Sequence, residues 1–162
     1  MAVCPPINLA ACCRRLNRGR NRLYDRHFVR LLMRQVRQLK SKIADPPPSP
    51  VRRPRGVWEF DEAYTAPVCG FGTAENYYRQ ASSAPLVGRI KLPTLILASR
   101  DDPLVCVEDF DRLDLPVAVK LHLTNRGGHL GFISRGGDDA DRRWMDWRVV
   151  EWVTGGPGLR KV

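Results

Sequence analysis

Pro93-Thr-Leu-Ile-Leu-Ala-Ser-Arg-Asp-Asp-Pro-Leu-Val105 is the stretch of this 162-residue chain that decides its fold. Within it, residues 94–98 form an apolar run of the length and character of a strand buried on both faces. A second strand is expected over residues 117–123, a short helix over residues 107–113 and a closing helix over residues 141–153. This alternation predicts an α/β protein with a parallel sheet and right-handed crossovers.

Acidic side chains and a histidine follow the two expected strands. Asp101 and Asp102 come directly after the first strand, and Gly127-Gly-His-Leu-Gly-Phe132, which contains His129, follows the second. Because the carboxyl ends of parallel strands open on the same edge of a sheet, groups 27 residues apart can meet there. Each signal alone is typical of an ordinary turn. Together, in this order, they predict the acid and the base of a hydrolytic triad.

The first half of the chain shows helical spacing and turn-forming residues. Residues 2–4 have the character of a strand end, which Pro5 and Pro6 close. Helical periodicity, a turn-prone joint at residues 17–21 and a run of prolines then predict helices separated by a turn and a loop. The helices are expected over residues 9–16, 24–43, 58–64 and 73–82, the last capped by Thr73, and the loop over residues 46–56.

Basic residues gather in the first 60 residues, which contain 14 Lys and Arg against three acidic residues, and the remainder is nearly neutral. Arg22, Arg26, Arg30 and Arg34 recur every four residues and share one face of a predicted helix. This face is either the solvated side of a packed helix or a surface that attracts an anionic membrane or acidic substrates. No nucleic acid is expected as a partner, because no recognition motif accompanies the charge.

Composition and cysteine usage indicate a globular protein. Hydrophobic residues make up 43% of the chain and charged residues 27%, and no apolar run approaches the roughly 18 residues of a membrane span. No basic region precedes the apolar N-terminal segment, so a secretory signal peptide is not expected. The five cysteines form no C-x-x-C pair and are predicted to be reduced, which favours the cytoplasm or a cytosol-facing membrane surface.

Several separate stretches, in the same order along residues 2–153, resemble the YheT-like branch of the α/β-hydrolase superfamily. They are Leu16-Asn-Arg-Gly19, Tyr24-Asp-Arg-His-Phe28, Phe60-Asp-Glu-Ala-Tyr-Thr-Ala-Pro67, Tyr77-Tyr-Arg-Gln-Ala-Ser-Ser83, residues 93–105 and Arg126-Gly-Gly-His-Leu-Gly-Phe-Ile133. Members of this branch are serine esterases or lipases that act on acyl or lipid esters without a metal or an organic cofactor. The resemblance therefore implies the C-terminal part of an α/β-hydrolase fold with a helical cap segment. It divides the chain into a remnant of a core strand (1–8), the cap (9–85), the C-terminal core (86–155) and a tail (156–162).

By the same resemblance, Asp102 is the triad acid and His129 the triad base. Asp101 is the alternative acid, but the family pattern places the carboxylate directly before Pro103. The family's serine lies in a G-x-S-x-G elbow, and this sequence contains no G-x-S-x-G. We therefore expect the chain to carry the acid and the base without the nucleophile, and to be inactive alone.

Other chemically interesting side chains are interpreted as structural. Cys106 is the thiol expected near the acid loop, as a buried apolar side chain. His27 in the basic helix and His122 in a strand lack the glycine framing of His129, and Trp144 and Trp147 are expected to pack on the sheet. Six aromatic residues of the cap suit either an acyl pocket or ordinary packing: Trp58, Phe60, Tyr64, Phe71, Tyr77 and Tyr78.

Three functions are compatible with these features. The main hypothesis is a C-terminal fragment of a serine carboxylic-ester hydrolase. The alternative is a short non-catalytic isoform that binds anionic lipid or a protein partner. A nucleic-acid binder that uses the arginine-rich helix is the third.

Overall fold

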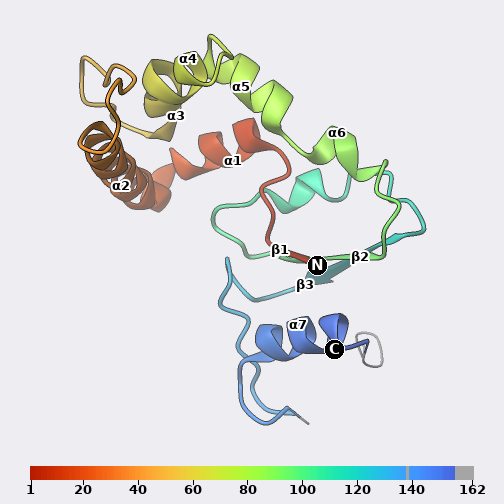
Figure 1. Cartoon of the computed structure of the whole chain (residues 1–162). Coiled ribbons are helices and arrows are strands. Elements are labelled where there is room, and N and C mark those ends of the chain that lie inside the picture. Colours follow the sequence, from red (N-terminus) through yellow and green to blue (C-terminus); the bar gives the residue numbers. More distant parts are fainter. Residues whose placement is uncertain (138, 156–162) are drawn as a thin grey trace. The chain divides into compact units, whose positions relative to one another are not determined.

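The computed structural model describes residues 1–137 and 139–155, which divide into two compact units. Unit 1 contains Met1–Ile7 and the chain from Ser83 onward, and unit 2 is Asn8–Ser82 (Figure 1). The first residues of the chain therefore fold with its second half, and unit 2 is one continuous segment inserted between them.

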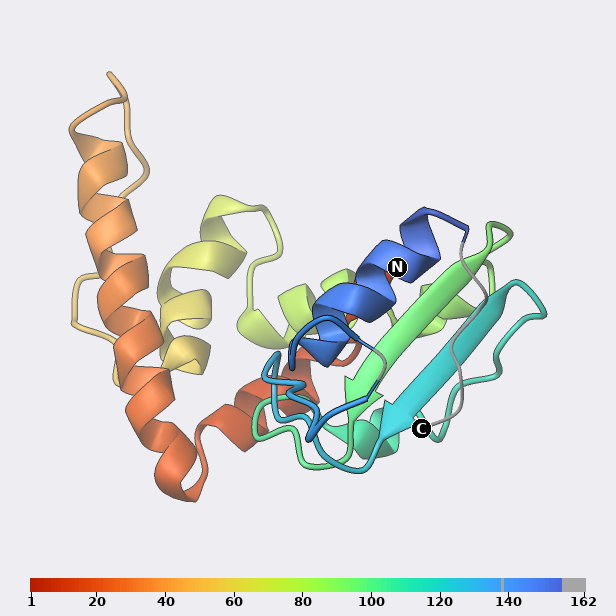
Figure 2. The ribbon, with the colours of Figure 1, turned by 90° about the horizontal axis from the view of Figure 1, so that it is seen from below.

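The sheet of unit 1 has three parallel strands in the order β1-β2-β3, as the alternation of strands and helices predicted. The strands are β1 (Ala2–Val3), β2 (Thr94–Ser99) and β3 (Val119–Thr124). Figure 2 shows β2 and β3 side by side and running in the same direction. Ser99 at the end of β2 pairs with Thr124 at the end of β3, so both strands end at one edge of the sheet.

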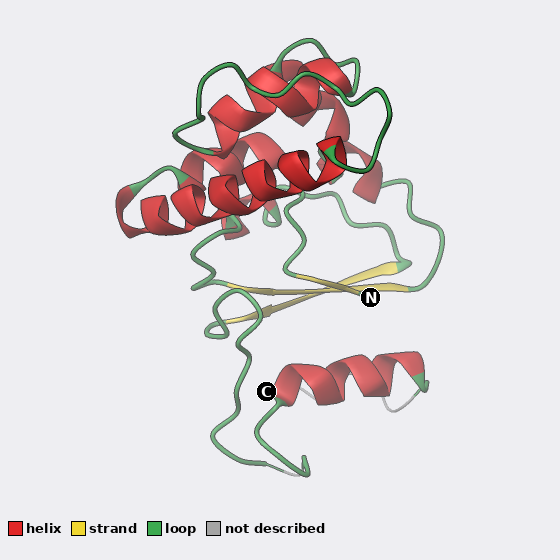
Figure 3. Cartoon of the chain, turned by 60° about the vertical axis from the view of Figure 1, so that its left-hand side comes forward, coloured by secondary structure: helices red, strands yellow, loops and turns green. Residues whose placement is uncertain are grey.

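The central strand β2 is buried from Leu95 to Ser99, with no residue in that span more than 3% exposed. Neighbouring strands flank it on both sides, and helices cover both faces of the sheet. Figures 1 and 3 show α7 (Trp144–Val153) on one face of the sheet. In Figure 1, α6 (Ala84–Val87) and a 3₁₀ turn at Val107–Asp109 lie on the other face. The apolar run from Leu95 to Ala98 in β2 is the consequence of this double coverage.

The prediction of a helix over residues 107–113 is wrong, because this segment forms only the 3₁₀ turn at Val107–Asp109. Its backbone makes successive three-residue bonds, from Phe110 N–H to Val107 C=O (2.9 Å) and from Leu113 N–H to Phe110 C=O (3.2 Å). So short a segment gains too few bonds to offset the cost of starting an α-helix, and Pro116 follows closely.

The closing helix begins three residues later than expected and buries a different face. Trp144 is buried as predicted, but Trp147 is only half-buried. Arg148 is buried instead, and its guanidinium donates to Asp139 (2.6 Å) and Glu151 (2.8 Å). An arginine with two carboxylate partners can be buried where an unpaired charge could not.

Unit 2 consists of helices and connecting loops, and its helices match the expected ones closely. The loop predicted over residues 46–56 contains no helix or strand. The elements are α1 (Leu9–Leu16), a 3₁₀ turn (Gly19–Asn21), α2 (Arg22–Lys40), α3 (Val57–Phe60), a π-helical turn (Asp61–Thr65), α4 (Ala66–Val68) and α5 (Ala74–Ala81). Among residues 1–137 and 139–155, no helix has both the length and the apolar character needed to cross a membrane.

Side-chain caps start two of these helices. The Asn8 side chain accepts the Ala11 N–H at the start of α1 (3.1 Å), and the Thr73 hydroxyl accepts the Asn76 N–H at the start of α5 (3.2 Å). The predicted Thr73 cap is therefore confirmed. On α2, the buried carboxylate of Asp25 accepts the Val57 N–H (2.7 Å), so it caps α3 from a neighbouring helix.

A small core surrounds Tyr78, which packs with Cys13 and Ala74. The buried Tyr78 hydroxyl donates to Asp61 Oδ2 (2.5 Å), and the Thr65 hydroxyl donates to Asp61 Oδ1 (2.6 Å). Burial raises the pKa of the Asp61 carboxyl, against the effect of these two donors. The two hydroxyl donors therefore offset part of the cost of burying the Asp61 carboxylate.

The Tyr78→Phe substitution removes one of the two hydroxyl donors to the buried Asp61 carboxylate. We expect it to lower the free energy of unfolding by about 1–3 kcal/mol, measured by urea denaturation of the purified chain. Tyr77→Phe is the matched control, because Tyr77 neighbours Tyr78 on α5 but is neither of the two hydroxyl donors to Asp61. Equal stability of the two variants would contradict this account of the core.

Candidate active site

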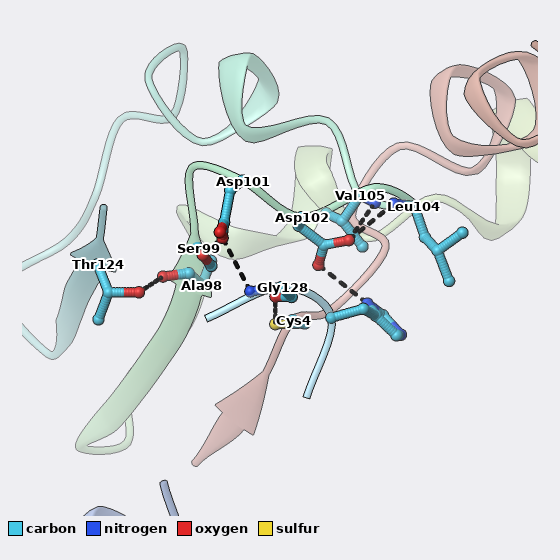
Figure 4. Close-up of polar contacts among 10 residues, drawn as sticks. Cys4, Ala98, Ser99, Asp101, Asp102, Leu104, Val105, Thr124 and Gly128 are labelled. Atoms are coloured by element: carbon cyan, nitrogen blue, oxygen red, sulfur yellow. Dashed lines mark hydrogen bonds and ion pairs between the residues drawn. The ribbon is translucent and has the colours of Figure 1, made fainter. Parts of the chain in front are cut away.

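The two sheet-edge loops bring the predicted acid and base together. Asp102 follows β2 (Figure 4). His129 follows β3, and its Nδ1 lies 2.9 Å from Asp102 Oδ2. The Asp102 side chain is 2% exposed, and the His129 side chain is 34% exposed. The ring is thus anchored at one nitrogen by a buried carboxylate and remains partly open to solvent.

Backbone hydrogen bonds fix the orientation of the Asp102 carboxylate independently of the histidine. Its Oδ1 accepts the backbone N–H groups of Leu104 (2.8 Å) and Val105 (3.0 Å), which leaves Oδ2 toward the imidazole. Pro103 cannot donate such a bond, and its fixed φ suits the tight turn that aims the two N–H groups back at the aspartate.

The Asp101 carboxylate contacts the end of β2 and the histidine loop instead of the His129 ring. Its Oδ1 accepts the Ser99 hydroxyl and the Gly128 N–H (2.8 Å), and these hydrogen bonds lower the pKa of the Asp101 carboxyl, the Ser99 hydroxyl most. Asp101 therefore ties the end of β2 to the histidine loop, and Asp102 is the carboxylate that contacts His129.

Glycine shapes the histidine loop for steric reasons. A Cβ at Gly127 would lie 2.5 Å from the Phe132 ring, and Phe132 is buried in a cluster with Leu97 and Trp144. Gly128 has a φ of +58°, and Leu130 carries a φ of +119° without being glycine. The loop combines a close approach to the core with left-handed backbone, which is why glycines precede the histidine.

Cys4 is the site residue that the sequence reading missed. Its sulfur, an Asp102 carboxylate oxygen and a His129 ring nitrogen all lie within 4.8 Å of one another. Burial, followed by the Asp102 charge, raises the pKa of the Cys4 thiol to about 12. Cys106, the thiol expected near the acid loop, does not belong to this group of side chains in the described part of the chain. The sequence signal that could have pointed to Cys4 is its position directly before Pro5-Pro6, at the end of an expected strand.

The other predicted structural residues lie outside this group. His122 in β3 stands 5.6 Å from the Trp144 ring between centroids, and burial lowers the pKa of its imidazole. His27 lies on α2 in unit 2, with its ring 6.2 Å from Phe28. The six cap aromatics pack on one another, as in Trp58–Tyr78 (5.0 Å between ring centroids). Ordinary packing within unit 2 therefore explains the presence of these aromatic residues.

The arrangement has the chemical properties of an acid–base pair. A carboxylate at Nδ1 favours the tautomer with the proton on Nδ1, which leaves the lone pair on Nε2 to accept a proton. Among the side chains that the structure describes, those of Cys4, Asp102 and His129 could jointly bind a metal ion. No serine stands in a G-x-S-x-G sequence, and the Ser99 hydroxyl is bonded to Asp101.

Several curated proteins are similar to this chain. YheT of Escherichia coli, whose name marks it as a candidate esterase, is 34% identical over 158 residues, which cover 94% of this chain and 46% of YheT. An abhydrolase domain-containing protein of Dictyostelium discoideum is 26% identical over 95% of this chain and 40% of its own length. A monoacylglycerol lipase of Saccharomyces cerevisiae is 30% identical over 76% of this chain and 28% of its own length.

The chain spans less than half the length of these three relatives. No protein-family model matches it, and no solved structure matches it significantly. The parallel sheet with flanking helices agrees with the C-terminal part of an α/β-hydrolase, and the similarity to YheT extends over nearly the whole chain. The chain is therefore a relative of the α/β-hydrolases of the YheT-like esterase branch.

Proposed function

We propose that this chain carries the acid and the base of a serine carboxylic-ester hydrolase, Asp102 and His129. The observation that supports the proposal most directly is the 2.9 Å contact between His129 Nδ1 and Asp102 Oδ2 at the shared edge of β2 and β3. In this role the aspartate holds the imidazole in one tautomer and stabilises its protonated form. The imidazole takes the proton of the attacking hydroxyl and later returns it to the leaving group.

The proposal assigns the nucleophile to a segment outside these 162 residues. The sequence contains no G-x-S-x-G elbow, which would supply both the serine and one backbone donor for the oxyanion. Cys4 does not fit the role, because nucleophilic cysteines have a lowered pKa and some exposure. The Cys4 thiol is 2% exposed, and its pKa is raised. We accordingly propose that the chain alone does not hydrolyse esters.

Acyl esters are the proposed substrate class. The yeast relative is named as a monoacylglycerol lipase, and a second yeast relative as a medium-chain fatty acid ethyl ester synthase/esterase. A His–Asp pair suits these substrates because ester cleavage needs one proton removed from the nucleophile and one given to the leaving alcohol.

Joining this chain to the part of YheT that it does not match should give an active esterase on a short-chain acyl ester. In that hybrid, His129→Ala should lower kcat/KM by about four orders of magnitude, because the base would be lost. His122→Ala is the matched control and should retain most of the activity. An active hybrid that keeps its rate after His129→Ala would contradict the role proposed for His129.

A second candidate function is binding of unit 2 to an anionic membrane surface, and a cavity on unit 2 favours it. The cavity has a volume of about 260 Å³ and is lined by Arg30, Met33, Arg37 and Arg53, with the three arginines exposed. Three guanidinium groups beside a thioether match a phosphate headgroup with an apolar tail.

The outer surface of α2 supports the same candidate. Leu23, Tyr24, Leu31 and Leu39 are 39–71% exposed. Large exposed apolar side chains beside a basic face are typical of helices that lie in the membrane interface. Within the described residues, nothing else in unit 2 packs over these side chains closely enough to bury them.

Changing Arg30, Arg37 and Arg53 together to Gln should weaken binding of the chain to vesicles rich in phosphatidylserine by about 100-fold. This follows from about 1 kcal/mol for each basic side chain near an anionic surface. The control variant changes Arg89, Lys91 and Lys120 to Gln, which removes the same charge from exposed positions of unit 1. Equal loss in both variants in a vesicle-sedimentation assay would show that net charge, not this cavity, drives the binding.

A further inference from the structure

Cys4 is held in an unusual way for a residue without an assigned role. It follows β1 with a φ of +44°, a conformation that non-glycine residues rarely adopt, and its N–H donates to the Leu97 carbonyl (2.7 Å). Its side chain is 2% exposed, and Sγ lies 4.0 Å from the Gly128 carbonyl oxygen in the histidine loop (Figure 4). The strand end thus places a thiol beside the two sheet-edge loops.

We propose that Cys4, Asp102 and His129 form a binding site for a thiophilic divalent cation of the Zn²⁺ class. The three side chains offer a sulfur, an oxygen and a nitrogen, all within 4.8 Å of one another. A zinc ion bound at about 2.3 Å from sulfur and 2.0–2.2 Å from nitrogen and oxygen sets its tetrahedral ligand atoms about 3.3–3.6 Å apart. Side-chain shifts of about 1 Å would bring atoms that lie within 4.8 Å of one another to that spacing.

The surroundings of the three ligands are those of a supported metal site. Asp102 Oδ1 is held by the N–H groups of Leu104 and Val105, so its Oδ2 is the oxygen that faces the histidine. Such second-layer hydrogen bonds fix a ligating carboxylate. His129 is 34% exposed, while Cys4 and Asp102 are buried, so the ion has a path from solvent past the imidazole. A water molecule from that side would occupy the fourth position.

The charges and protons of the site balance on binding. The ion replaces the proton on the Cys4 thiol, which leaves to solvent, and the neutral His129 keeps one proton, which moves from Nδ1 to Nε2. The two positive charges of the ion then meet one thiolate and one carboxylate, so the buried site is neutral overall. The thiolate, which burial and then the Asp102 charge disfavour in the metal-free chain, is stabilised by the same ion.

Binding has a consequence for catalysis that rests on the proposed function. An imidazole that coordinates the ion through Nδ1 carries its proton on Nε2 and cannot accept a second one from a nucleophile. The cation is therefore an inhibitor of the proposed acid–base pair, and its binding can be measured without any activity.

The test uses the purified 162-residue chain, reduced and freed of metal, titrated with Co²⁺ alone. We expect one equivalent to bind with a thiolate-to-cobalt charge-transfer absorption in the near ultraviolet, and Zn²⁺ to displace it. Cys4→Ser should abolish the band, because serine retains the size and a hydrogen-bond donor but supplies no thiolate. His129→Ala should weaken Zn²⁺ binding at least about tenfold.

Matched controls are Cys69→Ser and His122→Ala, which remove a free exposed thiol and an imidazole outside the site and should leave both readouts unchanged. Circular dichroism of each variant establishes that it is folded. No cobalt band in the unaltered chain, or a band that survives Cys4→Ser, would overturn the proposal. Neither result bears on ester hydrolysis, so this proposal and the proposed function fail or stand separately.

Discussion

The hydrogen bond between His129 and Asp102 depends on the parallel register of β2 and β3. Ser99 pairs with Thr124, so the loop after each strand starts from the same edge of the sheet, and three residues beyond Ser99 the chain reaches Asp102. A shift of one residue in this register would turn every side chain of a strand to the other face. Six residue pairs, from Thr94–Val119 to Ser99–Thr124, hold the two strands in that register.

Two carboxylates at the end of one strand have separate tasks in this arrangement. Asp102 is buried and bonds to the imidazole, while Asp101 bonds to the backbone of Gly128 and holds the loop that carries the imidazole. The two residues lie in the turn that follows β2, where the Asp102 N–H donates to the Ser99 carbonyl (3.3 Å), and this turn directs one carboxylate to the histidine and the other to the glycine loop. The Asp-Asp pair therefore fixes both the orientation of the ring and the position of its loop.

Much of this could be predicted because the signals are local. An apolar run predicted β2, and helical spacing predicted α1 and α5. The choice of Asp102 over Asp101 came from the family resemblance, which places the carboxylate directly before Pro103. The failures come from contacts distant in sequence. Arg148 is buried because Asp139 and Glu151 pair with it, which helical periodicity does not contain. Cys4 lies beside Asp102 because β1 pairs with β2, which brings together residues 98 positions apart in the sequence.

The tautomer of His129 in the metal-free chain is the most direct test of the central interaction, and it requires no nucleophile. Nitrogen-15 NMR of the neutral imidazole should show the proton on Nδ1, with a proton resonance shifted far downfield by the carboxylate. Asp102→Asn should remove that resonance, whereas Asp101→Asn should preserve it. A proton on Nε2 in the unaltered chain, or a spectrum unchanged by Asp102→Asn, would contradict the account.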